Sequence, residues 1–445
     1  MLFSRRALLG STFAAIFALP ARADGVRVLS VRKTTLRLLP EPAEETGVCG
    51  FDGQVPGSLL RCKKGDALAI RVVNRIDAPL SFACQGMRLE NAMDGVAGLT
   101  QAPIPPGGTF DYRVIPPDAG FFFYRSNVAP HGCEQLRQGL YGPFVVEEPD
   151  PPAADRDIVI VLADWQLNRA GQIAGAALSP PTDPPRTLTT ANSSPVAVTQ
   201  ILPPLTRIRL RLLNAAASRI LFVTFEKLKP MVLGIDGEPC EAFAPLQDTL
   251  PIGPGARFDV MFDLPAEAGT EARLVLRGAP APDQPLLVLK CAGQSRPNLP
   301  PIVSLPSNPL LPVSINLKAS RKLDLVIEGG ATNPAAPPDP LRLNGLPAEE
   351  FGEKPLFSVR RGTPVSLGLV NKTAFVQQIH VHGHHVRVLH DLDDGWDPYW
   401  RDSVIVAAGR AKHVAFLADN PGKWAIECLP LYPQSSELVA WFGVA

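Results

Sequence analysis

Asp66-Ala67-Leu68-Ala69-Ile70-Arg71-Val72-Val73-Asn74 is the stretch that decides the fold. Apolar and polar residues alternate along it, as in a β-strand with one face on a core and the other toward solvent. Residues 206–214 and 363–371 repeat this pattern, and each also ends in asparagine. The three stretches lie roughly 150 residues apart, which is the size of one ordinary domain. The sequence therefore predicts three copies of one β-sandwich.

Length and composition agree with an all-β chain of this kind. The chain has 445 residues, 46% of them hydrophobic, with 48 prolines and 5 tyrosines. Abundant proline favours many structured loops over long helices. Lys plus Arg and Asp plus Glu are equal, at 43 each. This neutral balance provides no electrostatic case for a nucleic-acid partner or for an anionic membrane surface.

Two proline-rich stretches predict the domain boundaries. Residues 147–152 read Glu-Glu-Pro-Asp-Pro-Pro, and prolines recur through residues 296–312. Such stretches are typical of linkers between domains. We expect domains at residues 24–150, 151–300 and 301–445.

The first 23 residues resemble a targeting signal. Arg5 and Arg6 form a twin-arginine pattern, an apolar run follows, and Ala21-Arg22-Ala23 provides small residues for cleavage before Asp24. A membrane anchor is the alternative, but the run is short for a span. We expect a soluble periplasmic protein exported by the twin-arginine pathway. Seven cysteines in an oxidising compartment leave at least one thiol without a partner in the chain, and their connectivity stays open.

Several motifs in a fixed order carry a resemblance to a known family. They are Met93-Asp94-Gly95, Gly139-Leu140-Tyr141-Gly142-Pro143, Ile235-Asp236-Gly237, His380-Val381-His382-Gly383-His384 and Trp400-Arg401-Asp402. Together with the asparagine-ended strands, they cover nearly all of the chain after the signal. In this order the chain resembles the laccase-like multicopper oxidases. The resemblance implies three cupredoxin-like Greek-key β-sandwich domains.

That family binds copper through four motifs of histidines and one cysteine, and the ligand positions can be checked one at a time. The positions that keep the family residue are His380, His382 and Cys428. The positions that have lost it are Ala83, Gln85, Arg125, Asn127, Gln377, Glu427, Leu429 and Pro433.

The remaining residues do not suffice for the copper chemistry of the family. A blue-copper centre needs two imidazoles and a thiolate. The resemblance places Gln377 and Pro433 beside Cys428, and a proline side chain has no donor atom. Of the histidines of the trinuclear cluster, His380 and His382 remain. We therefore expect no resident copper cofactor and no oxidase activity of the family type.

The replacements at the former copper positions predict a polar network instead. Gln85, Arg125, Asn127, Gln377 and Glu427 are polar or charged, and the resemblance brings these positions together between the first and third domains. Buried polar groups need partners, so we predict an ion pair between Arg125 and Glu427.

A single-metal site is the alternative at the same place. Asn127, His382 and Glu427 would share one former copper site with His380 close by, and two histidines with a carboxylate can bind one copper, iron or other transition-metal ion. Glu427 would then be a replacement ligand. Arg125 opposes a cation there, which favours the metal-free network.

Three further patterns have structural and functional interpretations. The run His380, His382, His384 and His385, followed by His390, can be a metal tract or strand residues inherited from the family motif. His131 and Cys133 lie in an expected extended loop, either as a surface metal pair or as a loop residue and half of a disulfide. The family resemblance brings Cys84 near Cys133, which would allow them to pair.

The leading functional hypothesis is a non-catalytic binding or scaffold protein of the cell envelope. The chain resembles the copper-free SufI/FtsP-type cell-division proteins, which implies surface contacts with a periplasmic protein partner. The alternatives are an oxidoreductase with a reduced metal site at His380, His382 and Glu427, or a metal-binding protein without turnover. Five methionines argue against a Cu(I) buffer, because such a protein favours soft sulfur ligands.

Overall fold

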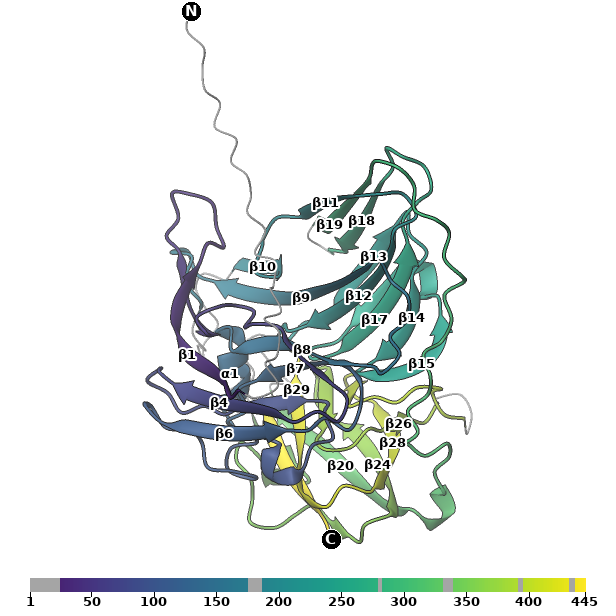
Figure 1. Ribbon diagram of the computed structural model, residues 1–445. Helices are drawn as coiled ribbons and strands as arrows, with labels where there is room; N and C mark the ends of the chain where they lie inside the picture. The colour runs from purple at the N-terminus through teal and green to yellow at the C-terminus, as the bar shows by residue number, and fades with distance from the viewer. Residues whose placement is uncertain (1–24, 175–185, 279–281, 331–338, 391–394, 432–436) are drawn as a thin grey trace, which may run out of the picture.

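The computed structural model describes the chain except for residues 1–24, 175–185, 279–281, 331–338, 391–394 and 432–436. Its described part contains six sheets (Figure 1), and each sheet takes all its strands from one of three consecutive segments, 27–147, 156–291 or 321–444. Two sheets per segment form a sandwich, which confirms the all-β prediction of three cupredoxin-like Greek-key sandwiches. The domain limits at residues 150 and 300 stay a prediction, and the signal at residues 1–23 lies outside the described residues.

Hydrogen-bonded neighbours set the order of the strands in each sheet. The first sandwich has the sheets β2 (Thr46–Phe51), β1 (Arg27–Leu36), β4 (Leu68–Asn74), β6 (Thr109–Val114) and β3 (Leu60–Lys63), β8 (Tyr141–Glu147), β7 (Gly120–Arg125), β5 (Ala83–Gln85). The second has β10 (Arg186–Ala191), β9 (Arg156–Leu167), β12 (Arg207–Asn214), β17 (Arg257–Asp263), β14 (Met231–Ile235), β15 (Glu238–Phe243) and β11 (Val198–Leu202), β19 (Gln284–Cys291), β18 (Glu271–Leu276), β13 (Leu221–Glu226), β16 (Thr249–Ile252). The third has β22 (Leu346–Pro347), β21 (Asp339–Leu343), β20 (Arg321–Gly330), β24 (Thr363–Asn371), β28 (Ala411–Ala418), β26 (Arg387–Val388) and β23 (Ser358–Val359), β30 (Leu438–Val444), β29 (Gly422–Pro430), β25 (Gln377–Val381), β27 (Ser403–Val406). One α-helix, α1 (Gly132–Arg137), and the short 3₁₀ turns η1 (Asn91–Met93), η2 (Leu246–Asp248) and η3 (Leu317–Ala319) complete the described elements.

The three asparagine-ended strands occupy equivalent places. β4, β12 and β24 each pair in parallel with the first strand of their own sandwich and antiparallel with a later one. The side chain of Asn371 donates to the carbonyls of Phe375 and Val406, at 2.7 and 3.1 Å. Asn74 and Asn214 make the equivalent pairs of bonds in their sandwiches. The predicted self-similarity therefore reflects one repeated way of fastening a strand end to the next turns.

One of these strands departs from the predicted half-buried pattern. Every residue of β12 is buried, including Arg209 and Arg211. Arg209 donates to Asp259, at 2.5 Å, and to Glu148, which follows the last strand of the first sandwich. The polar face of β12 is thus covered by ion-paired neighbours instead of solvent. Alternation alone cannot distinguish a polar face that is covered in this way from one that is exposed.

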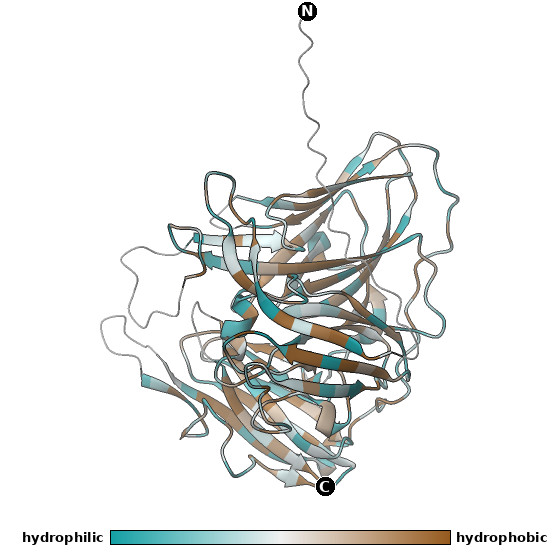
Figure 2. Ribbon diagram, turned by 60° about the vertical axis from the view of Figure 1, so that its left-hand side comes forward, coloured by the Kyte–Doolittle hydropathy of each residue, from teal (hydrophilic) through white to brown (hydrophobic). Residues whose placement is uncertain are grey.

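Apolar residues join the first two sandwiches. All six residues of β7 are buried. Phe122 and Tyr124 pack in the first core, whereas Phe121 and Phe123 pack with Trp165 in a cluster that spans both sandwiches. Figure 2 shows that hydrophobic residues occur along strands in every part of the molecule. The last residue of β7, Arg125, bonds to Glu427 of the third sandwich, so this strand contacts all three sandwiches.

Two smaller observations complete the fold. The expected extended loop around His131 and Cys133 is wrong, because α1 begins at Gly132 and Cys133 lies buried on it. Among the described residues, no helix is long and apolar enough to cross a membrane.

Candidate functional site

The former copper positions converge between the first and third sandwiches. β25 and β29 pair antiparallel, with His380 opposite Glu427. Successive residues of a strand point to opposite faces, so His380, His382 and Glu427 share the face toward the first sandwich. Opposite them, β5 and β7 pair with Ala83 facing Arg125 in register. The resemblance therefore predicted the meeting of these strands correctly.

An ion pair joins the two sandwiches at this place. Arg125 Nη2 donates to Glu427 Oε2 at 2.5 Å, and the two side chains are 7% and 5% exposed. Arg125 Nε also donates to Gln85 Oε1 at 3.1 Å. The second oxygen of Glu427 accepts from Asn127 Nδ2 at 2.5 Å. The predicted Arg125–Glu427 pair is confirmed, and Gln85 and Asn127 belong to its network, whereas the expectation that Gln377 joins it is wrong, because Gln377 bonds to Thr373.

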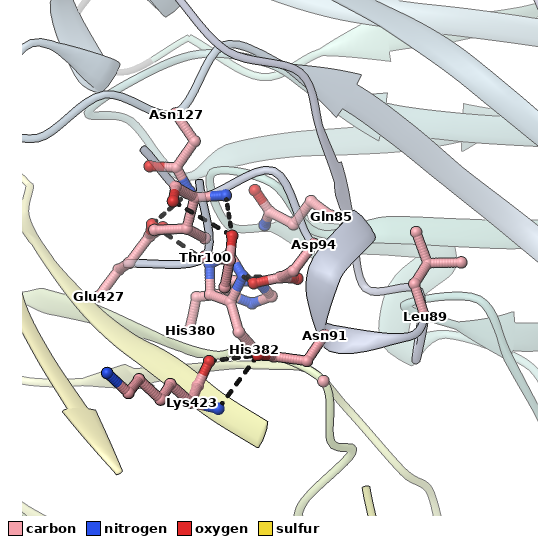
Figure 3. Close-up of polar contacts among 12 residues, drawn as sticks. Gln85, Leu89, Asn91, Asp94, Thr100, Asn127, His380, His382, Lys423 and Glu427 are labelled. Atoms are coloured by element: carbon pink, nitrogen blue, oxygen red, sulfur yellow. Dashed lines mark hydrogen bonds and ion pairs between the residues drawn. The ribbon is translucent and has the colours of Figure 1, made fainter. Parts of the chain in front are cut away.

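His382 lies between two carboxylates (Figure 3). Its Nδ1 is 3.0 Å from Asp94 Oδ2, and its Nε2 is 3.2 Å from Glu427 Oε1. Burial alone would lower the pKa of His382, but the charges of Asp94 and Glu427 raise it to about 10. Burial would raise the pKa of Glu427, but Arg125 and His382 hold it well below its usual range. Each ring nitrogen of His382 thus lies beside a carboxylate, with a hydrogen bond at Nδ1 and an ion-pair contact without hydrogen-bond geometry at Nε2.

His380 lines the same cavity, but its Nδ1 bonds within its own sandwich. Its Nδ1 lies 2.9 Å from the backbone oxygen of Asp402, and its ring centroid is 4.5 Å from that of His382. The rest of the histidine run does not gather around this place. His384 lies in the aromatic core beside Trp424, where burial lowers its pKa to about 3, and His390 is exposed.

The blue-copper positions do not fit a blue-copper ion. Cys428 is fully buried in the core of the third sandwich, and burial raises the pKa of its thiol well above the usual range. Gln377 takes the place of one imidazole and donates from Nε2 to Thr373 Oγ1 at 3.0 Å, while its Oε1 has no partner among the described residues. Pro433 lies outside the described residues. A protonated thiol beside an amide lacks the thiolate and imidazole set that such a centre needs.

The space between the two sandwiches is nearly filled. A cavity of about 40 Å³ remains, with Arg125, Glu427, Leu429 and Glu437 among its lining residues. Such a volume holds one or two water molecules. The trinuclear positions therefore present a guanidinium, two amides, a carboxylate and two histidines, and these residues do not fit a cluster held by eight imidazoles.

Sequence reasoning missed several residues of this network. Glu437 lies 3.7 Å from Arg125 Nη1 and accepts from Cys133 Sγ at 3.3 Å. Asp94 was visible only as part of the Met93-Asp94-Gly95 motif, with nothing to predict its contact with His382. The pairing of Cys84 with Cys133 is wrong, since all seven cysteines are free. Cys84 is in the core of the first sandwich, whereas Cys133 faces Glu437.

Comparisons with known proteins agree with the fold and the order of the motifs. Two family models described as multicopper oxidase match residues 32–151 and 321–445. The chain is 28% identical to multicopper oxidase MmcO of Mycobacterium tuberculosis, over 97% of this chain and 95% of that protein. Among solved structures, a multicopper oxidase from Pseudomonas thermotolerans superposes with a TM-score of 0.79 at 28% identity, covering 95% and 99% of the two chains. Lac15 from a marine microbial metagenome gives 0.77 at 30% identity, covering 94% and 100%. This chain belongs to the multicopper oxidase superfamily.

Proposed function

We propose that this protein is a non-catalytic member of its superfamily that acts as a binding or scaffold protein in the periplasm. The observation that carries the proposal is the Arg125–Glu427 ion pair, which lies where the family places copper ligands. A guanidinium and a bridged imidazolium supply positive charge there, and Asp94 and Glu427 balance it. Arg125, Asn127 and His382 Nδ1 find partners among the chain's own side chains, and this network balances its charge without a metal.

The same network supports a structural role for the former copper cavity. Arg125 and Asn127 from the first sandwich both bond to Glu427 of the third. Charge-assisted hydrogen bonds in a buried place are stronger than neutral ones. The network therefore fixes the first and third sandwiches relative to each other. A protein that binds a partner through its surface needs such a fixed arrangement. Export by the twin-arginine signal and a SufI/FtsP-like role at a cell-division assembly belong to this proposal.

The test is copper content together with activity. The chain is expressed with its own signal in copper-replete cells, purified from the periplasm, and analysed by mass spectrometry, visible absorption and oxidation of a phenolic substrate. We expect copper well below one equivalent, no intense blue thiolate-to-copper band and no oxidation above the rate with buffer. A blue band that disappears in Cys428→Ala would overturn the proposal, because it would require an intact copper centre.

A single-metal oxidoreductase is the second candidate. It is favoured by one observation, the closeness of His380, His382 and Glu427. Against it, His382 already contacts a carboxylate with each ring nitrogen, and Arg125 occupies Glu427. Copper or iron near one equivalent, lost in both His382→Ala and Glu427→Ala while the protein stays folded, would favour this candidate.

A further inference from the structure

A second polar cluster lies where the three sandwiches meet. Asp118 precedes β7, Glu238 begins β15, and His385 follows β25, so each comes from a different sandwich. All three are buried, with 2%, 1% and 2% of their surface exposed. One potential ligand atom from each lies within 4.8 Å of the other two. In the part of the chain that the structure describes, this is the one group of histidine, cysteine or carboxylate side chains so arranged.

His385 points into this cluster without a hydrogen bond. Its Nδ1 lies 3.4 Å from Glu238 Oε1, and neither ring nitrogen has a hydrogen-bond partner among the described residues. Buried polar atoms are nearly always paired, and an exception calls for a reason such as an ion. Burial and the nearby charge of Arg88 lower the pKa of His385 to about 4, so the ring is neutral. A neutral imidazole is the form that binds metals.

The two carboxylates are held in place by neighbouring donors. Arg88 donates to both oxygens of Asp118 at 2.8 Å. Asn308 donates to Asp118 Oδ1 at 2.7 Å and to Glu238 Oε2 at 3.0 Å. Burial and the charge of Asp118 raise the pKa of Glu238 to about 8. Donors behind a carboxylate are the usual outer support of a metal ligand.

The charges at the cluster leave room for a cation. Arg88 also lies 3.6 Å from Asp419 Oδ2. When Asp118, Glu238 and Asp419 are all ionised, Arg88 balances one of their three charges, and the charge of Lys64 acts on Glu238 without pairing with it. A divalent cation would neutralise the negative charge that remains and take the place of the proton on Glu238.

We propose that Asp118, Glu238 and His385 bind one divalent cation of the zinc class. Bonds of about 2.0–2.1 Å in a tetrahedral site place two ligand atoms about 3.3 Å apart, close to the 3.4 Å between His385 Nδ1 and Glu238 Oε1. Asp118 Oδ2 accepts one hydrogen bond, from Arg88, and keeps a lone pair for an ion. A nitrogen ligand beside two carboxylates suits zinc or cobalt better than calcium or magnesium, which prefer oxygen alone.

A cavity reaches one side of the cluster, at Glu238. This cavity of about 310 Å³ lies between the first two sandwiches, and Glu238 and Asn308 are in its wall. An ion bound at Glu238 faces this cavity and keeps a water molecule from it as its fourth ligand. This inference is independent of the proposed function, since it uses none of the former copper positions.

The experiment titrates Co²⁺, and then Zn²⁺, into the full mature chain after treatment with a chelator. Visible d–d absorption and calorimetry report the stoichiometry and affinity. We expect one equivalent, bound through nitrogen and oxygen without a thiolate-to-cobalt band, and weakened at least tenfold in Glu238→Gln and His385→Gln. Because Glu238 carries a proton at neutral pH, glutamine mimics its neutral form, and Glu238→Gln should fold even where His385→Gln does not. Glu427→Gln, at the former copper cavity, is the control, titrated at a temperature where circular dichroism shows it folded because it loses the partner of Arg125, and it should bind as the unchanged protein does.

Each result decides the proposal. Weak binding by the unchanged protein, or equal affinity in Glu238→Gln, overturns it. Binding that survives in Glu238→Gln but disappears in Glu427→Gln places the ion in the former copper cavity, and then it is the proposed function that also fails. One equivalent that depends on Glu238 and not on Glu427 supports the cation site and leaves the proposed function standing.

Discussion

Arg125 shows how one residue can take over the electrostatic part of a metal ion. Its guanidinium is always charged, and its donors reach Glu427, Gln85 and, more distantly, Glu437. A buried ion pair of this kind is worth little against a well-packed apolar pair, but breaking it by removing one partner leaves a charge without compensation. The sequence with its resemblance was sufficient to predict the pair. It did not predict Asp94 or Glu437, because their contacts depend on side chains far apart in the chain.

We expect Arg125→Met to destabilise the protein by about 3–5 kcal/mol, because the buried carboxylate of Glu427 loses its ion-pair partner. Urea denaturation followed by tryptophan fluorescence measures the free energy of unfolding. The double variant Arg125→Met/Glu427→Gln is the control and should regain much of the loss, since no buried charge is then left over. An unchanged free energy of unfolding in Arg125→Met would contradict the role of the pair.

The stability of the protein should decrease with alkaline pH through His382. Its pKa is raised from 6.5 to about 10 in the folded protein, so its contribution is complete below about pH 6.5 and is lost as pH rises toward 10. The slope is at most about 1.4 kcal/mol per pH unit for one proton. We expect the free energy of unfolding of His382→Gln to depend less on pH than that of the unchanged protein between about pH 7 and 10. Parallel profiles would show that His382 is not charged.

At the scale of single elements, the alternation of apolar and polar residues predicted the strands better than the contacts of the site. The asparagine-ended strands β4, β12 and β24 were found from alternation and their last residue. Alternation could not show that β12 is buried on both faces, because a buried arginine with an acidic partner has the same pattern as an exposed one. It also could not find α1, which is six residues long and follows from local packing.

The asparagine at the end of β24, Asn371, should contribute strongly to the stability of the third sandwich. Asn371 Nδ2 donates to three backbone carbonyls, and its Oδ1 accepts from the backbone of Thr373. Asn371→Asp keeps the shape but turns a donor into an acceptor facing carbonyls. We expect a loss of about 1–3 kcal/mol or more, since buried groups are left unpaired. Asn298→Asp, at an exposed position, is the control. Urea denaturation measures the free energy of unfolding, and an equally small change in both variants would refute this role of Asn371.

At the scale of the whole molecule, one arginine connects all three sandwiches. Arg257, on β17 of the second sandwich, donates to the backbone oxygen of Phe121 in the first and to Asp402 Oδ2 in the third, at 3.1 and 2.6 Å. Arg257 and Asp402 are fully buried. The motifs around Asp236 and Asp402 were part of the family resemblance, so their positions were predictable. The link between them through the guanidinium of Arg257 was not predictable, because it joins residues that are distant in sequence.

We therefore expect Arg257→Met to weaken the coupling between the sandwiches as well as the stability of each. Asp402 would be left buried without its cation, at a cost of about 3–5 kcal/mol. Because this loss falls on the contact between sandwiches, calorimetry should show one unfolding transition broadening or dividing into separate ones. Arg277→Met is the matched control, since Arg277 is an exposed arginine of the second sandwich paired with Asp283 and Glu226, and exposed pairs contribute about 0–1 kcal/mol. A single transition of unchanged sharpness in Arg257→Met would show that apolar packing around Trp165 and Phe121 couples the sandwiches without the arginine.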